Sequence, residues 1–151
     1  MELDMEIHME VARVLVLESR ESQLLELREV EGERIFPIRI GRPEADAIRR
    51  RILGQKPPRP QTHELLDNVL GELGWDVEKV VINDLSEEVV VNELGMEEKW
   101  ATFYARLHLR QGQQVADIDS RPSDAIAMSV RNDVPIFVAQ HVLEYNKPET
   151  G

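Results

Sequence analysis

The first half of the chain alternates short runs of branched apolar residues with polar stretches. Two such runs, residues 11–17 and 22–28, are separated by a polar stretch, a pattern typical of a β-hairpin. A second polar turn leads into residues 34–40, so the pattern predicts a three-stranded meander that stops at Gly41. Because Pro37 has no N–H to donate, we expect this third strand to lie at a sheet edge or to carry a bulge.

Two helices are predicted after the meander. Pro43 suits the first position of a helix, and the helical spacing of the following apolar residues predicts a helix over about 43–53. The three prolines within residues 55–60 exclude a regular helix or central strand and predict an extended connector. Thr62 is predicted to cap a second helix that stops before Gly74. Its apolar stripe, which we expect to cover the sheet like that of the first helix, consists of Leu65, Leu66, Val69, Leu70 and Leu73.

The second half of the chain predicts more strands. They are expected over residues 77–82, 89–92 and 102–109, with turns near Asn83-Asp84 and Glu97-Glu98. In the strand over residues 102–109 apolar and polar residues alternate strictly. This alternation is typical of an antiparallel strand with one buried face.

The last third of the chain predicts a further strand, a helix and a short strand. Gly112 turns the chain into a strand that ends at Asp119, and Pro122 opens a helix that runs to about Arg131. Residues 135–138 form a last short strand.

Two segments of the sequence echo each other. Residues 42–48 and 121–126 both start with Arg-Pro and end with Asp-Ala-Ile if one gap is allowed, which suggests a duplication, although such helix starts also recur for local reasons. We expect an α+β fold of mostly antiparallel mixed sheets, built from two related strand–helix repeats with helices packed on the sheets. The predicted organisation is one domain over residues 11–145, a flexible segment over 1–10 and a frayed tail over 146–151.

Composition narrows the possible functions. A chain of 151 residues suits a single domain, and the absence of cysteine excludes thiol nucleophiles, cysteine-bound zinc, iron–sulfur clusters and disulfides. With 5% aromatic residues, base stacking can be only a minor mode of recognition. The first ten residues hold four acids, unlike a signal peptide, and no segment resembles a membrane span, so we expect a cytoplasmic protein.

A basic run stands out against a net charge of −11, which repels nucleic acid and anionic membranes. Residues 48–59 hold five basic residues and no acid. Contact with phosphates is one interpretation, and an exposed helix face neutralised by neighbouring acids is the other. Three consecutive arginines point around most of a helix, so they cannot all face one ligand. The basic residues of the run are Arg49, Arg50, Arg51, Lys56 and Arg59.

A second polar cluster follows directly. Arg59, His63 and Glu64 fall within six positions at the start of a predicted helix. Helix N-termini attract anions, and a histidine can act as acid or base near neutral pH. The alternative is that His63 and Glu64 are simply exposed in a first turn capped by Thr62.

A third cluster contains three carboxylates, those of Asp117, Asp119 and Asp124. They could bind a divalent cation such as Mg²⁺ or Mn²⁺, or orient a water for attack on phosphorus. In the structural alternative Asp124 stabilises a helix dipole and Arg121 pairs with Asp119. The cluster also contains Ser120 and Ser123.

Three motifs resemble the bifunctional nuclease (BFN) family: residues 35–41, 59–66 and 118–126. The resemblance covers roughly residues 11–145. It implies a compact α+β domain with repeated strand–helix units, commonly a dimer. It also implies nuclease activity on RNA and DNA, as described for plant members.

We therefore expect a nuclease that hydrolyses phosphodiesters of RNA or single-stranded DNA. Arg59 and Arg121 would hold phosphate, His63 would move a proton, and the carboxylates would bind a cation or activate water, with His63 close to Asp119. One alternative is a non-catalytic binding or regulatory homodimer whose polar motifs are structural, and another is a hydrolase of a small phosphorylated or acylated metabolite. The predicted catalytic residues are His63, Asp119, Asp124 and Arg121; the substrate-binding residues are Arg59, Arg49, Arg50, Lys56, Ser120 and Ser123; the metal ligands are Asp117, Asp119 and Asp124.

Overall fold

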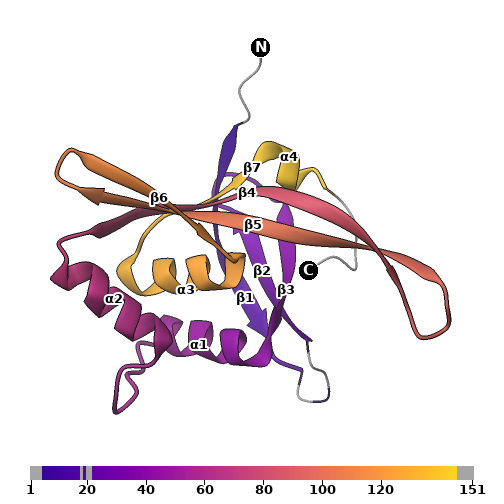
Figure 1. Cartoon of the computed structure of the whole chain (residues 1–151), viewed down its shortest axis with the longest axis horizontal. Helices are drawn as coiled ribbons and strands as arrows, with labels where there is room; N and C mark the ends of the chain where they lie inside the picture. Colours follow the sequence, from indigo (N-terminus) through magenta and orange to yellow (C-terminus); the bar gives the residue numbers. More distant parts are fainter. Residues whose placement is uncertain (1–4, 18, 20–21, 146–151) are drawn as a thin grey trace.

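The computed structural model describes residues 5–17, 19 and 22–145, which form a seven-stranded mixed sheet with helices packed on it (Figure 1). The α+β prediction is therefore confirmed, as a single sheet. Within the described residues no helix is long and apolar enough to span a membrane. The strands are β1 (Glu6–Leu15), β2 (Ser22–Glu29), β3 (Ile35–Gly41), β4 (Asp76–Val91), β5 (Glu97–Gln111), β6 (Gln114–Ser120) and β7 (Ile136–Ala139), and the helices are α1 (Arg42–Ile52), α2 (Thr62–Glu72), α3 (Pro122–Asn132) and α4 (Gln140–Leu143).

The predicted meander is confirmed. The antiparallel strands β1, β2 and β3 form one side of the sheet, and β3, which contains Pro37, is its edge strand. Strand β1 starts at Glu6, earlier than its apolar pattern indicates, because Glu6–Met9 pair with β7. Residues 6–10, expected in a flexible segment, are thus part of the sheet. The expected tail over 146–151 lies outside the described residues.

Strands β4 and β5 form a long antiparallel hairpin that projects beyond the sheet (Figure 1). The turn expected near Asn83-Asp84 is wrong, because the register shifts there by a bulge and β4 continues. The turn expected near Glu97-Glu98 is also misplaced. The chain reverses earlier, where the Asn92 side chain accepts hydrogen bonds from the backbone N–H groups of Leu94 and Met96. Local turn chemistry at Asn92 therefore decides the position of this reversal.

The order of the strands is β3-β2-β1-β7-β4-β5-β6. Strand β7 lies between the two antiparallel groups and is parallel to β4. The chain reaches it through α3, as a parallel pair requires a crossover. This late strand joins the two halves into one sheet, and the duplication suggested by the sequence echo remains a prediction.

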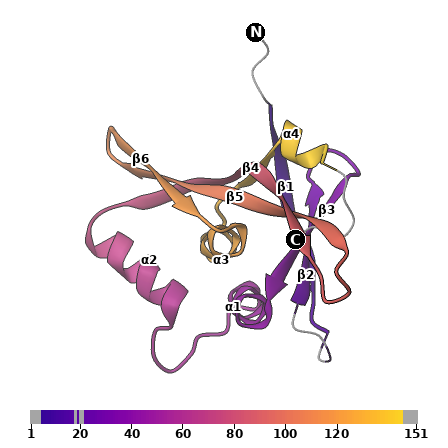
Figure 2. The ribbon, with the colours of Figure 1, turned by 45° about the vertical axis from the view of Figure 1, so that its right-hand side comes forward.

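Helices α1 and α3 pack against one face of the curved sheet (Figure 2). Their side chains Ile48, Ile126 and Met128 are fully buried, as are Ile82 and Ala105 of the sheet. The alternation expected in β5 is confirmed, since its odd-numbered residues from 101 to 109 are buried. The apolar core thus fixes the position of α1 and α3 relative to the sheet.

Helix α2 differs from its prediction. It packs beside α3 rather than on the sheet, and its apolar residues Leu65 and Leu73 are 56% and 62% exposed. Its N-cap is Gln61 instead of Thr62, because Gln61 and Glu64 form a reciprocal capping box. The apolar stripe therefore does not specify where this helix docks.

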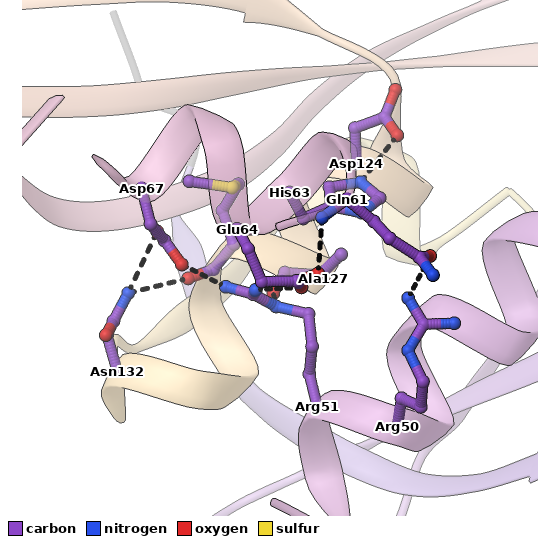
Figure 3. A network of polar contacts seen from close by, with 10 residues as sticks. Arg50, Arg51, Gln61, His63, Glu64, Asp67, Asp124, Ala127 and Asn132 are labelled. Carbon is purple, nitrogen blue, oxygen red and sulfur yellow. Dashed lines mark hydrogen bonds and ion pairs between the residues drawn. The ribbon is translucent and has the colours of Figure 1, made fainter. Parts of the chain in front are cut away.

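Arg51 of α1 joins α2 and α3 to α1 (Figure 3). Its Nε donates to the carbonyl oxygen of Ala127 in α3 at 2.6 Å. Its Nη1 and Nη2 donate to Glu64 Oε2 at 2.9 Å and Asp67 Oδ2 at 2.6 Å, both in α2. The Arg51 side chain is 2% exposed. Arg51 therefore cannot make the phosphate contact that one interpretation of the basic run offered, because two carboxylates neutralise it away from solvent.

We predict that Arg51→Ala lowers the free energy of unfolding by about 3–5 kcal/mol, because Glu64 and Asp67 then lose their buried counter-charge. Thermal denaturation followed by circular dichroism measures the effect. The matched control is Arg49→Ala, an exposed arginine of the same helix, which should change stability by less than about 0.5 kcal/mol. Equal melting temperatures for the two variants would show that Arg51 does not hold the helices together.

Candidate functional site

The first turns of α1, α2 and α3 meet around a small hollow of about 210 Å³. The first N–H groups of a helix lack intrahelical partners, and the helix dipole adds positive partial charge there. Each first turn also carries an acid, Glu44, Glu64 or Asp124. The hollow therefore combines a positive backbone environment with carboxylates that can hold basic side chains. Its lining consists of Pro43, Glu44, Ala47, Arg50, Gln61, Thr62, His63, Arg121 and Asp124.

A histidine–aspartate pair connects α2 and α3 at this hollow. His63 Nε2 lies 3.0 Å from Asp124 Oδ1, and the His63 side chain is 11% exposed. The hydrogen bond from His63 is the largest influence on the pKa of Asp124, which it lowers against the opposing effect of burial, and Arg121 lowers it further. An ionised carboxylate can only accept, so Nε2 carries the hydrogen and Nδ1 of a neutral ring is the proton acceptor. The pair can therefore take up a proton at Nδ1.

Arg121 connects the same aspartate to α1. Its Nε donates to Asp124 Oδ2 at 2.9 Å and its Nη1 to Glu44 Oε1 at 3.2 Å. These hydrogen bonds, that to Asp124 foremost, raise the pKa of Arg121. The side chain is nevertheless 64% exposed, and a guanidinium has five N–H groups, so several can still bind an anion. Arg121 is held in place and remains accessible.

Two further hollows meet the small one at Arg121. The larger, of about 610 Å³, lies between α2, α3, β5 and β6 and contains His63, Leu66, Tyr104 and Asp124 in its lining. The third, of about 310 Å³, lies between β3, β5 and the start of α3. Because Arg121 lines all three, an extended ligand could pass it on either side.

The predicted basic run is divided between different environments. Arg50 lines the small hollow, where its Nη2 donates to Gln61 Oε1 at 2.9 Å. Arg49, Lys56 and Arg59 are exposed, and none of them lines the three hollows at Arg121. The helical geometry of residues 49–51 explains this division, since consecutive residues point in different directions.

The two predicted serines lie on either side of Arg121. Ser120 Oγ donates to the carbonyl oxygen of Arg121 at 2.8 Å, and Ser120 lines the larger hollow. Ser123 is buried and lines the third hollow. Both are thus at the site, and Ser120 also supports the turn into α3.

The three predicted carboxylates are not brought together. In the register of β5 and β6, Asp117 is opposite His108 and Asp119 is opposite Arg106, on the sheet face away from the helices. Asp119 still borders the larger hollow, which His63 and Asp124 also line, whereas Asp117 lies 3.7 Å from His108. Across residues 5–17, 19 and 22–145 there is no group of three or more histidine, aspartate or glutamate side chains that could hold a metal ion.

The sequence places Glu44 only near the start of the helix predicted over 43–53, with no sign that it binds a distant residue. In the structure it holds Arg121 across a separation of 77 residues. The echo between residues 42–48 and 121–126 was the available signal, since it indicates that two similar helix starts occur in the fold. Their proximity depends on the packing of α1 against α3.

Comparison with known proteins identifies the same family that the three sequence motifs resemble. The model described as the bifunctional nuclease domain matches residues 25–150. The uncharacterized proteins MT1877 and Rv1829 of Mycobacterium tuberculosis, from strains CDC 1551 and H37Rv, are each 37% identical to this chain over 133 residues. These matches cover 88% of this chain and 71% of each relative.

The lowered pKa of Asp124 predicts a pH-dependent contribution to stability. A carboxyl group whose pKa is lower in the folded state than its ordinary 3.8 stabilises the fold above that value, and the contribution is lost as the pH falls through the folded-state pKa. We therefore expect the stability advantage of wild type over Asp124→Asn to decrease as the pH falls from about 5 through the folded-state pKa of Asp124. Urea denaturation across this range measures the difference. A difference that grows over this acidic range would contradict the proposed ionised carboxylate.

Proposed function

The chain belongs to the bifunctional nuclease domain family, and we propose that it is a nuclease that hydrolyses phosphodiesters of RNA or single-stranded DNA at the His63–Asp124–Arg121 site. The observation that carries this proposal is the pairing of His63 with a carboxylate beside an accessible arginine. The paired histidine can take up a proton, and the arginine can bind a phosphate. In this proposal the chain acts in the cytoplasm.

Arg121 would bind the scissile phosphate. Its exposed N–H groups could donate to two phosphate oxygens and stabilise the charge that develops when phosphorus becomes five-coordinate. Arg50 supports the same role, since it lines the small hollow together with Arg121. Exposed Arg49, Lys56 and Arg59 would add weaker attraction for flanking phosphates.

His63 would act as the general base. A water oxygen attacks phosphorus, its proton passes to Nδ1 of His63, and the bond from phosphorus to the leaving sugar oxygen breaks. Solvent or the protonated His63 returns a proton to the leaving oxygen. Ionised Asp124 stabilises the imidazolium that forms and fixes the orientation of the ring. Asp119 borders the larger hollow, but its side chain is on the sheet face away from His63, so it has no direct role in this mechanism.

A divalent cation remains open in this proposal. Asp124 lines two of the hollows at Arg121, and carboxylate oxygens are the ligands that Mg²⁺ and Mn²⁺ prefer. Since the described residues do not gather three such side chains, most ligands of a bound ion would be water or substrate oxygens. Cleavage assays with Mg²⁺, with Mn²⁺ and with a chelator show whether the reaction requires a divalent cation.

We predict that His63→Ala lowers the rate of cleavage of single-stranded oligonucleotides by about 10²- to 10⁴-fold, the usual contribution of a general base. Labelled RNA and DNA of one sequence, resolved by gel electrophoresis, provide the assay. His108→Ala is the matched control, because His108 lies on the sheet face away from the helices. Equal rates for wild type and folded His63→Ala protein would assign the cleavage to a contaminating nuclease.

A second candidate function is a non-catalytic binding or regulatory homodimer. One observation favours it, because both carboxylates around Arg121 already pair with it and could serve only to fasten α3 to α1. The cleavage assay distinguishes the two functions, since a wild-type binding module would not cleave the oligonucleotides. The metabolite hydrolase is less well supported, because three separate hollows, rather than one, share Arg121 in their lining.

Homodimer formation is part of either proposal. Exposed apolar residues of α2 and β6 support it, including Leu65, Leu73 and Val115, which are 56%, 62% and 66% exposed. We predict a mass of twice 17.4 kDa in sedimentation equilibrium. Leu65→Asp should shift the protein toward monomers by placing charge in the apolar surface. A wild-type protein that stays monomeric at all concentrations would contradict this prediction.

A further inference from the structure

The third hollow at Arg121 opens between two strand edges that have no neighbouring strand on that side. Strand β3 is the edge of the sheet, and β6 pairs with β5 only over Ala105–Gln111. Residues 97–104 of β5 are thus left with an open edge. The hollow lies between these two edges and the start of α3, and its lining consists of Ser22, Ile38, Arg39, Ile40, Gly41, Trp100, Thr102, Phe103, Arg121, Pro122 and Ser123.

Trp100 brings an aromatic side chain to the lining of this hollow. The side chain is 49% exposed although tryptophan is among the residues with most to gain from burial. Its indole Nε1 donates to Glu98 Oε2 at 3.0 Å, which favours one orientation of the ring. A half-exposed ring with a favoured orientation loses less side-chain entropy when a planar ligand stacks on it.

Charge and hydrogen-bonding groups accompany this ring. Arg121 lies at the boundary with the two other hollows, where the proposed phosphate binds. The hydroxyl-bearing residues Thr102 and Ser123 also line this hollow, as does Arg39. An aromatic ring can stack on the base, polar groups can bind the edge of the base, and a cation can bind the phosphate. Together these groups match a nucleotide.

We infer that the third hollow is a nucleobase subsite, in which Trp100 stacks on the base of a nucleotide whose phosphate is bound by Arg121. This inference rests on the proposed function and defines its substrate more closely. A hollow of about 310 Å³ is near the lower size limit of ligand pockets, so it accommodates a single nucleotide and excludes a duplex. Since every base has a π-face, stacking on Trp100 tolerates different sequences. The substrate class is therefore single-stranded nucleic acid with one base unstacked from its neighbours.

Binding of matched oligomers tests this subsite. We compare a fluorescein-labelled single-stranded DNA with an abasic phosphodiester oligomer of equal length, using His63→Ala protein to prevent turnover. Trp100→Ala should weaken binding of the DNA by about tenfold or more, as the loss of one base–aromatic stack does, and leave binding of the abasic oligomer unchanged. Trp100→Phe should restore most of the affinity, because it retains an aromatic face.

Val89→Ala is the matched control for this experiment. Val89 is exposed on the neighbouring strand and does not line the hollow. Val89→Ala, made in the His63→Ala protein, should therefore leave the affinity for both oligomers unchanged. Equal weakening of both oligomers by Trp100→Ala would overturn the inference, because Trp100 would then act through the backbone or the fold. An unchanged affinity for the DNA would overturn it as well.

Tryptophan fluorescence tests the stacking directly. The chain has two tryptophans, so Trp75→Phe leaves Trp100 as the only tryptophan in the protein. Adenosine 5′-monophosphate should quench its emission in a saturable manner, and ribose 5-phosphate should not. Quenching by neither compound, or equally by both, would contradict base stacking.

The outcomes separate this inference from the proposed function. Cleavage that depends on His63, without any base-dependent effect of Trp100, would retain the nuclease and remove the subsite. Saturable quenching by the nucleotide, without cleavage by wild type, would retain the subsite in a nucleic-acid-binding protein that does not cleave.

Discussion

The guanidinium group of Arg51 lies buried between the carboxylates of Glu64 and Asp67, and the placement of His63 depends on this arrangement. Helix α2 does not pack on the sheet and leaves much of its apolar stripe in solvent, so hydrophobic burial alone does not fix it. The two ion pairs and the bond from Arg51 to the backbone of α3 supply directional contacts instead. His63, in the first turn of α2, is thereby held within hydrogen-bond distance of Asp124.

The same helix starts that pack together also create the electrostatic character of the site. A chain with net charge −11 repels a polyanion as a whole, yet three helix N-termini and two arginines meet at one place on its surface. Their attraction is local and will weaken with added salt. Glu44 and Asp124 reduce it but hold Arg121 in a defined position. These two ion pairs therefore fix the position of Arg121 and lower the positive potential of the site.

The open edges of the sheet determine where a ligand can approach. Strand β6 is shorter than β5, and β3 ends the sheet on the other side. The resulting hollow places Trp100 within reach of the same arginine that borders the proposed catalytic pair. The projecting β4–β5 hairpin therefore contributes to the candidate site as well as to the sheet (Figure 1).

The sequence by itself determined much of the local structure, but not the turns of the β4–β5 hairpin. Alternation predicted β5, prolines predicted the starts of α1 and α3 and the edge position of β3, and three motifs identified the family. Only the tertiary structure decided that Arg51 is buried while Arg50 faces the site, that Glu44 holds Arg121, and that Asp117 and Asp119 face away from Asp124. Local patterns specify which side of a strand or helix is apolar, because that depends on neighbouring residues. Contacts between residues far apart in the chain depend on how the helices dock, and here a buried ion pair rather than an apolar stripe fixes that docking for α2.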